Sequence, residues 1–289
     1  MTKHQAFNRA EEDIGNIIGL EHLNLLVPDQ RLATIFYISG LGLTRDPYLM
    51  TGADIMWVNA GRTQFHLPTR GTQVLRGHTG LVINDFPRLT ARLKSVRKPL
   101  KGTMFGYKRG RGYIEVVCPW GNRYRCYPPG KRFGAMQHGI PYICFDVPKD
   151  AADPIARFYR AIIGAPARIG SFDKASAAYV CAGADQKLIF RENSGRQAEF
   201  DGHHIQVYFA DFSGPYNRLL ERGLISMETD QHEYRFEVIV DPDNDQAVFQ
   251  IEHEVRSLRH PLYGRPLVNR NPAQRNNAYQ PGSDMLGTT

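Results

Sequence analysis

Alternating apolar and polar residues from Gly19 to Asp29 indicate a β-strand with two different faces. His22 and Asn24 share the polar face, and the opposite face carries Leu23, Leu25 and Val27. The apolar face is suited to packing against a helix, whereas the polar face presents an imidazole to whatever lies across from it. Most of the functional information in this sequence lies in the polar faces of this strand and of similar strands later in the chain.

The residues after this strand predict a βαβββ unit. Helical spacing of apolar residues predicts a helix over 29–40, and strand-like runs follow at 46–50, 55–59 and 63–67, separated by glycines. The same order begins again with strands at 78–85, 140–147 and 204–211 and with helices at 86–96, 155–163 and 216–222. Four such units in one chain predict an α+β fold with mixed sheets.

Internal repetition indicates that the units form two related halves. The dipeptides Phe36-Tyr37 and Phe158-Tyr159 lie 122 residues apart, and Pro119 precedes Pro242 by 123 residues. Such similar offsets at independent places favour two homologous halves of two units each.

A strand with histidine, a helix containing Phe-Tyr that ends at glycine, and paired βαβββ modules together resemble the vicinal oxygen chelate superfamily. This superfamily includes glyoxalase I, antibiotic-binding resistance proteins and extradiol dioxygenases, and the resemblance covers about 19–254. Two paired-module domains in one chain look most like the extradiol dioxygenases. The resemblance implies cup-shaped sheets, each able to hold a divalent metal ion, such as Fe, Mn, Zn or Ni, through residues of the first and last strands of its modules.

We therefore expect an N-terminal helix over 1–18, a first paired βαβββ domain over 19–130 and a second over 136–255. The last segment, 256–289, contains five arginines against one acidic residue and is interrupted by prolines, so we expect an extended basic arm. Its apolar residues indicate that it lies against the body or against the other subunit of a homodimer.

The polar faces of the first half predict a metal site. His22, His66 and His78 are the expected ligands, because imidazole binds Fe, Zn, Mn and Ni and three protein ligands leave an open position. The acidic ligand that the superfamily takes from the last strand is replaced by Arg125, whose guanidinium cannot ligate. Either the histidines bind the ion without a carboxylate, or no ion is bound and Arg125, with Arg123 on the same face, binds an anionic substrate.

The second half carries an incomplete version of the ferrous site of the extradiol dioxygenases, which resembles two histidines and a glutamate. Tyr142 stands at the first histidine position, His204 matches the second, and Gln250 or Glu252 stands at the third. The superfamily's acid–base residues imply catalytic roles for Tyr142, His232 and Tyr234. Tyr208, on the polar face of the strand that begins at His204, is a further substrate-binding candidate.

Composition excludes several other classes of protein. The formal net charge is +7, but the arm supplies much of it, and no basic stripe interleaved with aromatics indicates nucleic-acid binding. No apolar run reaches the roughly 20 residues needed to span a bilayer, and the N-terminus lacks a signal-peptide pattern, so we expect a cytoplasmic protein with no membrane partner. The spacing of the four cysteines excludes a zinc ribbon and is typical of buried free thiols.

The sequence leaves two functional hypotheses open. The leading hypothesis is a metal-dependent enzyme, dioxygenase-like or glyoxalase-like, acting on a small oxygenated or aromatic molecule whose adjacent oxygens the metal would chelate. The second is a non-catalytic protein that binds a small molecule, as resistance proteins do, with degenerate metal sites. The absence of a complete two-histidine-plus-carboxylate set in either half favours the second hypothesis.

Overall fold

The computed structural model describes residues 8–49, 52–271, 274–275, 277 and 279–280. It contains the four expected βαβββ modules, so the predicted α+β fold is confirmed. The first module comprises β1 (Ile17–Asn24), α1 (Gln30–Ala33) with a π-helical turn (Thr34–Gly40), β2 (Thr44–Arg45), β3 (Ile55–Ala60) and β4 (Thr63–Pro68). The second comprises β5 (Gly77–Val82), α2 (Phe86–Ser95), β6 (Gly106–Gly110), β7 (Tyr113–Val117) and β8 (Arg123–Tyr127).

The third module comprises β9 (Gly139–Val147), α3 (Ala152–Phe158) with a π-helical turn (Tyr159–Ile163), β10 (Ala167–Phe172), β11 (Ala175–Cys181) and β12 (Lys187–Glu192). The fourth comprises β13 (His204–Phe209), α4 (Ser213–Leu220), β14 (Ile225–Asp230), β15 (Glu233–Val240) and β16 (Ala247–Ser257). No helix among the described residues has the length and apolar character that crossing a bilayer requires.

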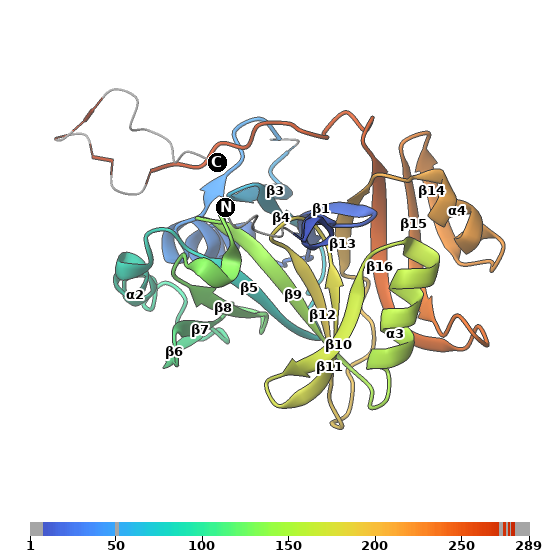
Figure 1. Cartoon of the computed structure of the whole chain (residues 1–289). Helices are drawn as coiled ribbons and strands as arrows, with labels where there is room; N and C mark the ends of the chain where they lie inside the picture. The colour runs from blue at the N-terminus through green and yellow to red at the C-terminus, as the bar shows by residue number, and fades with distance from the viewer. Residues whose placement is uncertain (1–7, 50–51, 272–273, 276, 278, 281–289) are drawn as a thin grey trace, which may run out of the picture.

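The strands form two open eight-stranded sheets whose composition differs from the expected one (Figure 1). Sheet I has the order β14-β15-β16-β13-β1-β4-β3-β2, and sheet II has the order β10-β11-β12-β9-β5-β8-β7-β6. Sheet I therefore joins the first module to the fourth through the antiparallel pair β1 and β13, and sheet II joins the second to the third through β5 and β9. The expectation that each sequential half forms its own cup is wrong, because each cup is shared between the halves.

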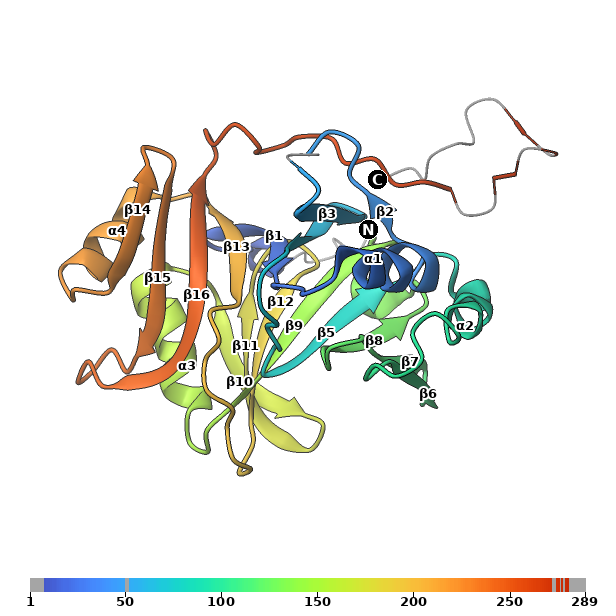
Figure 2. The same ribbon diagram turned by 180° about the vertical axis from the view of Figure 1, so that it is seen from behind.

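The sequential halves are held together instead by their helices and buried aromatic residues. The hydroxyl of Tyr37, in the first module, lies 2.6 Å from that of Tyr124, in the second. The hydroxyl of Tyr159, in the third module, lies 2.6 Å from His253 Nε2, in the fourth. The repeated Phe-Tyr dipeptide is thus a core feature of each half. Accordingly, α1 and α2 lie at one end of the molecule and α3 and α4 at the other, as Figures 1 and 2 both show.

The predicted N-terminal helix is wrong in its described part. Only the four residues Arg9–Glu12 form a helical turn, of 3-10 type, and β1 already begins at Ile17. Gly15 adopts a φ of +72°, which ends any helix there. The Asn16 side chain then donates to the carbonyls of Ile163 and Asp211, so this segment is held extended across the other half.

The arm that follows β16 crosses sheet I and docks on the first module (Figure 2). Tyr263 packs against Tyr208 with ring centroids 4.9 Å apart. Further along, the Asn269 side chain forms two hydrogen bonds with the backbone of Gly61, and Asn59 donates to the carbonyl of Val268 at 2.9 Å. The arm therefore lies against the body of its own chain.

Truncation after Leu258 should destabilise the protein, because it leaves the buried Asn59 side chain and the Gly61 backbone without these partners. We expect the free energy of unfolding to fall by about 2–4 kcal/mol, at about 1 kcal/mol for each hydrogen bond. Urea unfolding measures this loss. A chain cut after Asn271 keeps every contact named above and should unfold like the full chain; equal losses in both truncations would contradict the prediction. Light scattering on the same samples tests the expected homodimer.

Candidate metal centre

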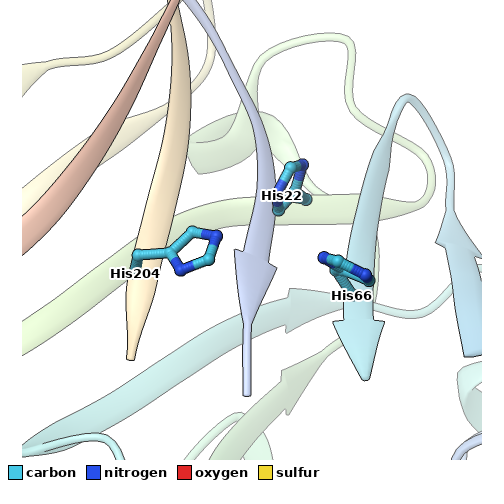
Figure 3. Close-up of side chains that lie close together, drawn as sticks. All are labelled: His22, His66 and His204. Atoms are coloured by element: carbon cyan, nitrogen blue, oxygen red, sulfur yellow. The ribbon is translucent and has the colours of Figure 1, made fainter. Parts of the chain in front are cut away.

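Three histidines from three neighbouring strands of sheet I converge on one point. They are His22 on β1, His66 on β4 and His204 on β13, and their ligating nitrogens all lie within 4.8 Å of one another. Figure 3 shows the three rings approaching the same space. Strand register explains the convergence. Asn24 pairs with His204 on one side and with His66 on the other, so these three residues lie in one row across the sheet. His22 lies two residues before Asn24 on β1 and therefore shares the same face of the sheet.

A bulge in β1 gives His22 its orientation. The pairing with β13 shifts between Leu20 and His22, which leaves Glu21 as an extra residue. Glu21 Oε2 lies 3.3 Å from His22 Nδ1, although consecutive residues of a regular strand point to opposite faces. A carboxylate at Nδ1 favours the tautomer that carries its proton there and leaves the Nε2 lone pair free. Nε2 is buried and has no hydrogen-bond partner.

Burial favours the neutral form of His22 and His66. Burial, followed by the neighbouring His22 and His204, lowers the pKa of His66 to about 2, and burial also lowers the pKa of His22. The His66 ring stacks on the indole of Trp57, with centroids 3.9 Å apart and planes 9° apart. Trp57 also contacts His22 edge-on, so this indole fixes the position of two rings at once. Neutral, fixed imidazoles are what metal ligation requires.

A network of carboxylates and arginines adjoins the histidines. Glu254 Oε2 lies 3.2 Å from His204 Nε2, and Glu252 Oε1 lies 3.3 Å from His204 Nδ1. Burial alone would raise the pKa of Glu254, but the neighbouring His204, His22 and Arg256 hold that pKa well below its usual range. Glu254 is therefore an ionised carboxylate beside the three imidazoles.

The network has an excess of negative charge. Its carboxylates are those of Glu21, Glu233, Glu252 and Glu254, and its guanidinium groups are those of Arg235 and Arg256. The formal charge of these six largely buried side chains is −2. Buried charge is costly unless it is paired, and a divalent cation among the histidines would neutralise the group. The donor set and the charge therefore both fit a divalent metal ion.

Buried polar groups without partners surround the same space. Both amide atoms of Gln206 and the Asn24 Oδ1 atom are buried and have no hydrogen-bond partner in the structure. Gln206 pairs with His22 in the sheet, and Asn24 pairs with His204. Unsatisfied buried polar groups in a native protein require an explanation, and a bound ion or polar ligand provides one.

The structure separates some of the residues that the sequence analysis placed together. His78 lies on β5 of sheet II and cannot join His22 and His66, because β5 pairs with β9 rather than with β1. Tyr142, Arg123 and Arg125 also belong to sheet II. Tyr142 contacts His78 at 3.3 Å and Tyr127 at 2.7 Å through its hydroxyl. The expected three-histidine set is thus completed by His204 in place of His78.

Other expected site residues lie away from the histidines. Tyr234 packs against Phe212 and Tyr216 on the helix-facing side of β15. Its neighbours Glu233 and Arg235 lie on the opposite side of the strand and belong to the network. His232 lies in the turn before β15, where its Nδ1 is 3.5 Å from the hydroxyl of Ser257. Gln250 is exposed and donates to Glu237 at 3.1 Å.

Two remaining candidates do lie at the site. Tyr208 donates to Glu21 at 3.0 Å, and Glu252 forms part of the network.

Sequence reasoning missed several residues of the site, of which Glu254, Arg256, Glu21 and Trp57 are the most important. Glu254 lies two residues after Glu252 and so on the same face of β16. Extending the predicted strand to its full eleven residues would therefore have identified it. Trp57 shares its face with His66 as a cross-strand pair, which a hairpin register would have predicted. Nothing in the local pattern indicates the bulge that turns Glu21 toward His22.

Acid should weaken the fold through buried histidines outside this centre. Burial lowers the pKa of His78 to about 3 and that of His138 to about 4. Because both values lie below the ordinary 6.5, the unfolded chain binds these protons first as the pH falls, so stability present at neutral pH is lost from about pH 6.5 downward. Each histidine should cost about 2 kcal/mol between pH 7.5 and pH 5.

Urea unfolding at the two pH values measures this loss. Between pH 7.5 and pH 5, His138→Gln should lose about 2 kcal/mol less stability than the wild type, because one of the two histidines has been removed. Equal pH dependence in the two proteins would contradict the assignment.

The fold, four βαβββ modules combined into two open mixed sheets, is also found in solved structures of glyoxalases and dioxygenase-like proteins. Glyoxalase I from Zea mays has a similar structure, with a TM-score of 0.56 at 13% sequence identity, over 83% of this chain and 92% of that chain. A point mutant of the same maize enzyme matches with the same TM-score at 14% identity, over 83% and 92% of the two chains.

A protein of Bacillus subtilis provisionally described as a dioxygenase matches with a TM-score of 0.54 at 13% identity, over 84% of this chain and 86% of that chain. No model of a known protein family matches the sequence, and no curated protein shows a significant match. These likenesses establish the fold, and the site must be judged from its own residues.

Proposed function

We propose that this protein is a divalent-metal-dependent enzyme, glyoxalase-like or dioxygenase-like, whose active centre is the cup of sheet I. The observation that carries the proposal is the convergence of His22, His66 and His204 beside the ionised carboxylate of Glu254. The substrate class follows from the centre: a small molecule with adjacent oxygen atoms could chelate an ion that three imidazoles and a carboxylate leave partly open. Imidazole-rich ligation suits Fe, Mn, Zn or Ni rather than calcium or magnesium.

The three histidines would hold the ion with Glu254 beside them, and the ion would act there as a Lewis acid toward substrate oxygens. Glu21 would keep the proton of His22 on Nδ1 and so direct Nε2 to the ion. The unsatisfied amides of Asn24 and Gln206 would orient the substrate by hydrogen bonds. Glu252 is the more exposed of the two carboxylates beside His204, with 16% of its side chain accessible against 3% for Glu254, so it is the group placed to take up or release a proton.

Metal content tests the first step of this proposal. Protein without a His-tag is reconstituted anaerobically with Fe, Mn, Zn or Ni and analysed by inductively coupled plasma mass spectrometry. We expect near-stoichiometric metal in the wild type and its loss in His22→Ala, with retention in His78→Ala, the matched histidine of sheet II. No retained metal in the wild type, or equal retention in both variants, would overturn the proposal.

Activity then separates the two enzyme classes. Dioxygen uptake with catechols by the iron-loaded protein would support the dioxygenase-like function. Isomerisation of the adduct of a 2-oxoaldehyde with a thiol, without dioxygen uptake, would support the glyoxalase-like one.

One observation favours a second candidate, a non-catalytic binding protein with a degenerate metal site. Arg235 and Arg256 already contact the Glu254 carboxylate, at 2.7 and 2.6 Å, so this residue has cationic partners without any metal. Binding of a small ligand with no metal retained would establish this candidate instead.

A further inference from the structure

The cup of sheet II repeats the layout of sheet I with different chemistry. Strand register relates the two sheets: His78 on β5 occupies the position of His22, and Gly80 that of Asn24. By the same pairing, Tyr142 stands where His204 does, Arg125 where His66 does and Ile189 where Glu254 does. Sheet II thus keeps one of the four metal-binding positions and places a guanidinium at another.

Arginines dominate the charged groups of this second cup. Arg191 is held by Asp146, with its Nε 3.0 Å from Oδ1, and Arg123 approaches the same carboxylate at 3.6 Å. Arg125 makes a bidentate pair with Asp173, at 3.0 and 2.6 Å, and Arg191 reaches Asp173 at 2.9 Å. If Asp173 were withdrawn, Arg125 would lose its bidentate carboxylate partner, and Asp146 would remain in contact with Arg123 and Arg191.

Asp173 belongs to the tip of the β10–β11 hairpin rather than to the floor of the cup. Phe172 pairs with Ala175, which leaves Asp173 and Lys174 as a two-residue turn, with φ values of 50° and 70°. β10 is the edge strand of sheet II and pairs with β11 alone. The Asp173 side chain is 37% exposed, so the carboxylate that occupies two arginines comes from a surface turn.

The residue next to Asp173 fills the rest of the cup with an aromatic ring. Phe172 stacks on His78 with centroids 5.8 Å apart and lies edge-on to Tyr142 at 5.7 Å. The Tyr142 ring in turn lies over Gly80, where an added Cβ would come within 2.4 Å of it. The hairpin therefore places a phenyl ring against an aromatic floor and a carboxylate against two arginines.

We propose that the cup of sheet II is a binding site for a small aromatic carboxylate, for which Phe172 and Asp173 are a built-in substitute. The ligand's carboxylate would take the bidentate position on Arg125 and its ring the place of the Phe172 side chain, while the hairpin moves outward. Arginine and carboxylate match in this geometry, and the exchange replaces one ion pair by another of the same kind. This site is independent of the metal centre of sheet I.

Calorimetric titration of the full chain with benzoate tests the proposal, with benzamide as the uncharged probe of the same shape. Asp173→Asn removes the internal competitor, so benzoate should bind at least about tenfold more tightly than to the wild type. Adding Arg125→Gln to Asp173→Asn should then weaken binding by about tenfold or more, because the bidentate contact is lost. Benzamide should gain little from Asp173→Asn.

Matched variants control for unrelated effects. Asp150→Asn also removes a surface carboxylate at positive φ, and Arg109→Gln removes an exposed arginine of sheet II; neither should change benzoate binding. His22→Ala should also leave it unchanged, because that residue lies in the other cup. The proposal is overturned if Asp173→Asn binds benzoate no more tightly than the wild type, or if Arg125→Gln has no effect in the Asp173→Asn background.

Discussion

Glu254→Gln should weaken divalent metal binding by about 100-fold, the upper end of the losses seen when groups that support a metal site are removed. The amide preserves the shape of the side chain but lowers the negative charge of the buried network from −2 to −1. It also replaces an ionised oxygen beside His204 with a neutral group. Competition with a chromophoric chelator, using Zn or Mn, measures the dissociation constant.

Glu237→Gln is the matched control for this variant. Glu237 also lies in sheet I, but it accepts a hydrogen bond from Gln250 rather than from a member of the network. Its substitution should leave metal affinity unchanged. If Glu254→Gln bound metal as tightly as the wild type, Glu254 would have no part in the centre, and the carboxylate contribution would have to come from Glu252.

Arg256→Met should destabilise the metal-free protein by about 3–5 kcal/mol, the usual effect of removing one partner from a buried ion pair. The Arg256 side chain is 9% exposed and contacts Glu21 at 3.2 Å, Glu233 at 3.1 Å and Glu254 at 2.6 Å. Without it, Glu21 loses its guanidinium partner, and Arg235 alone remains for Glu233, Glu252 and Glu254. Urea unfolding measures the loss, and added divalent metal should restore part of it, because a cation then neutralises the network.

Arg157→Met provides the comparison. Arg157 also contacts three carboxylates, those of Asp153, Asp241 and Asp243, but its side chain is 28% exposed. Solvent screens such a pair, so this substitution should cost only about 0–1 kcal/mol. Similar losses for both arginines would show that burial of the network does not determine its energetics. A loss confined to Arg256 would confirm that the centre is a charged group held together in a buried environment.

The two cups are related by strand register but carry different chemistry. Sheet I combines imidazoles with excess negative charge, which suits a cation, whereas sheet II combines arginines with an aromatic floor, which suits an aromatic anion. The pair Glu254 and Ile189 illustrates the difference, because equivalent strand positions carry a carboxylate in one cup and an alkyl side chain in the other. Fold similarity alone would have assigned one function to both sheets.

The sequence alone determined the modules and the faces of their strands. Two-residue alternation identified His22, His66 and His204 as inward-facing, since a side chain's face is fixed by its local position in a strand. Tyr234 was expected from the superfamily resemblance rather than from alternation, and along β15 it packs on the helix-facing side while Arg235 faces the cup. The N-terminal helix failed because Gly15 and the long-range hydrogen bonds of Asn16 outweigh the local helical pattern.

Only the tertiary structure decided which faces share a cup. Pairing of β1 with β13, and of β5 with β9, joins strands that are far apart in the chain, and no local pattern distinguishes this arrangement from cups formed within each half. That choice brings His204 and Glu254 to His22 and separates them from His78. Short-range alternation in the sequence thus determined which side chains each strand presents on its polar face. Long-range strand pairing determined which of these faces combine into one site.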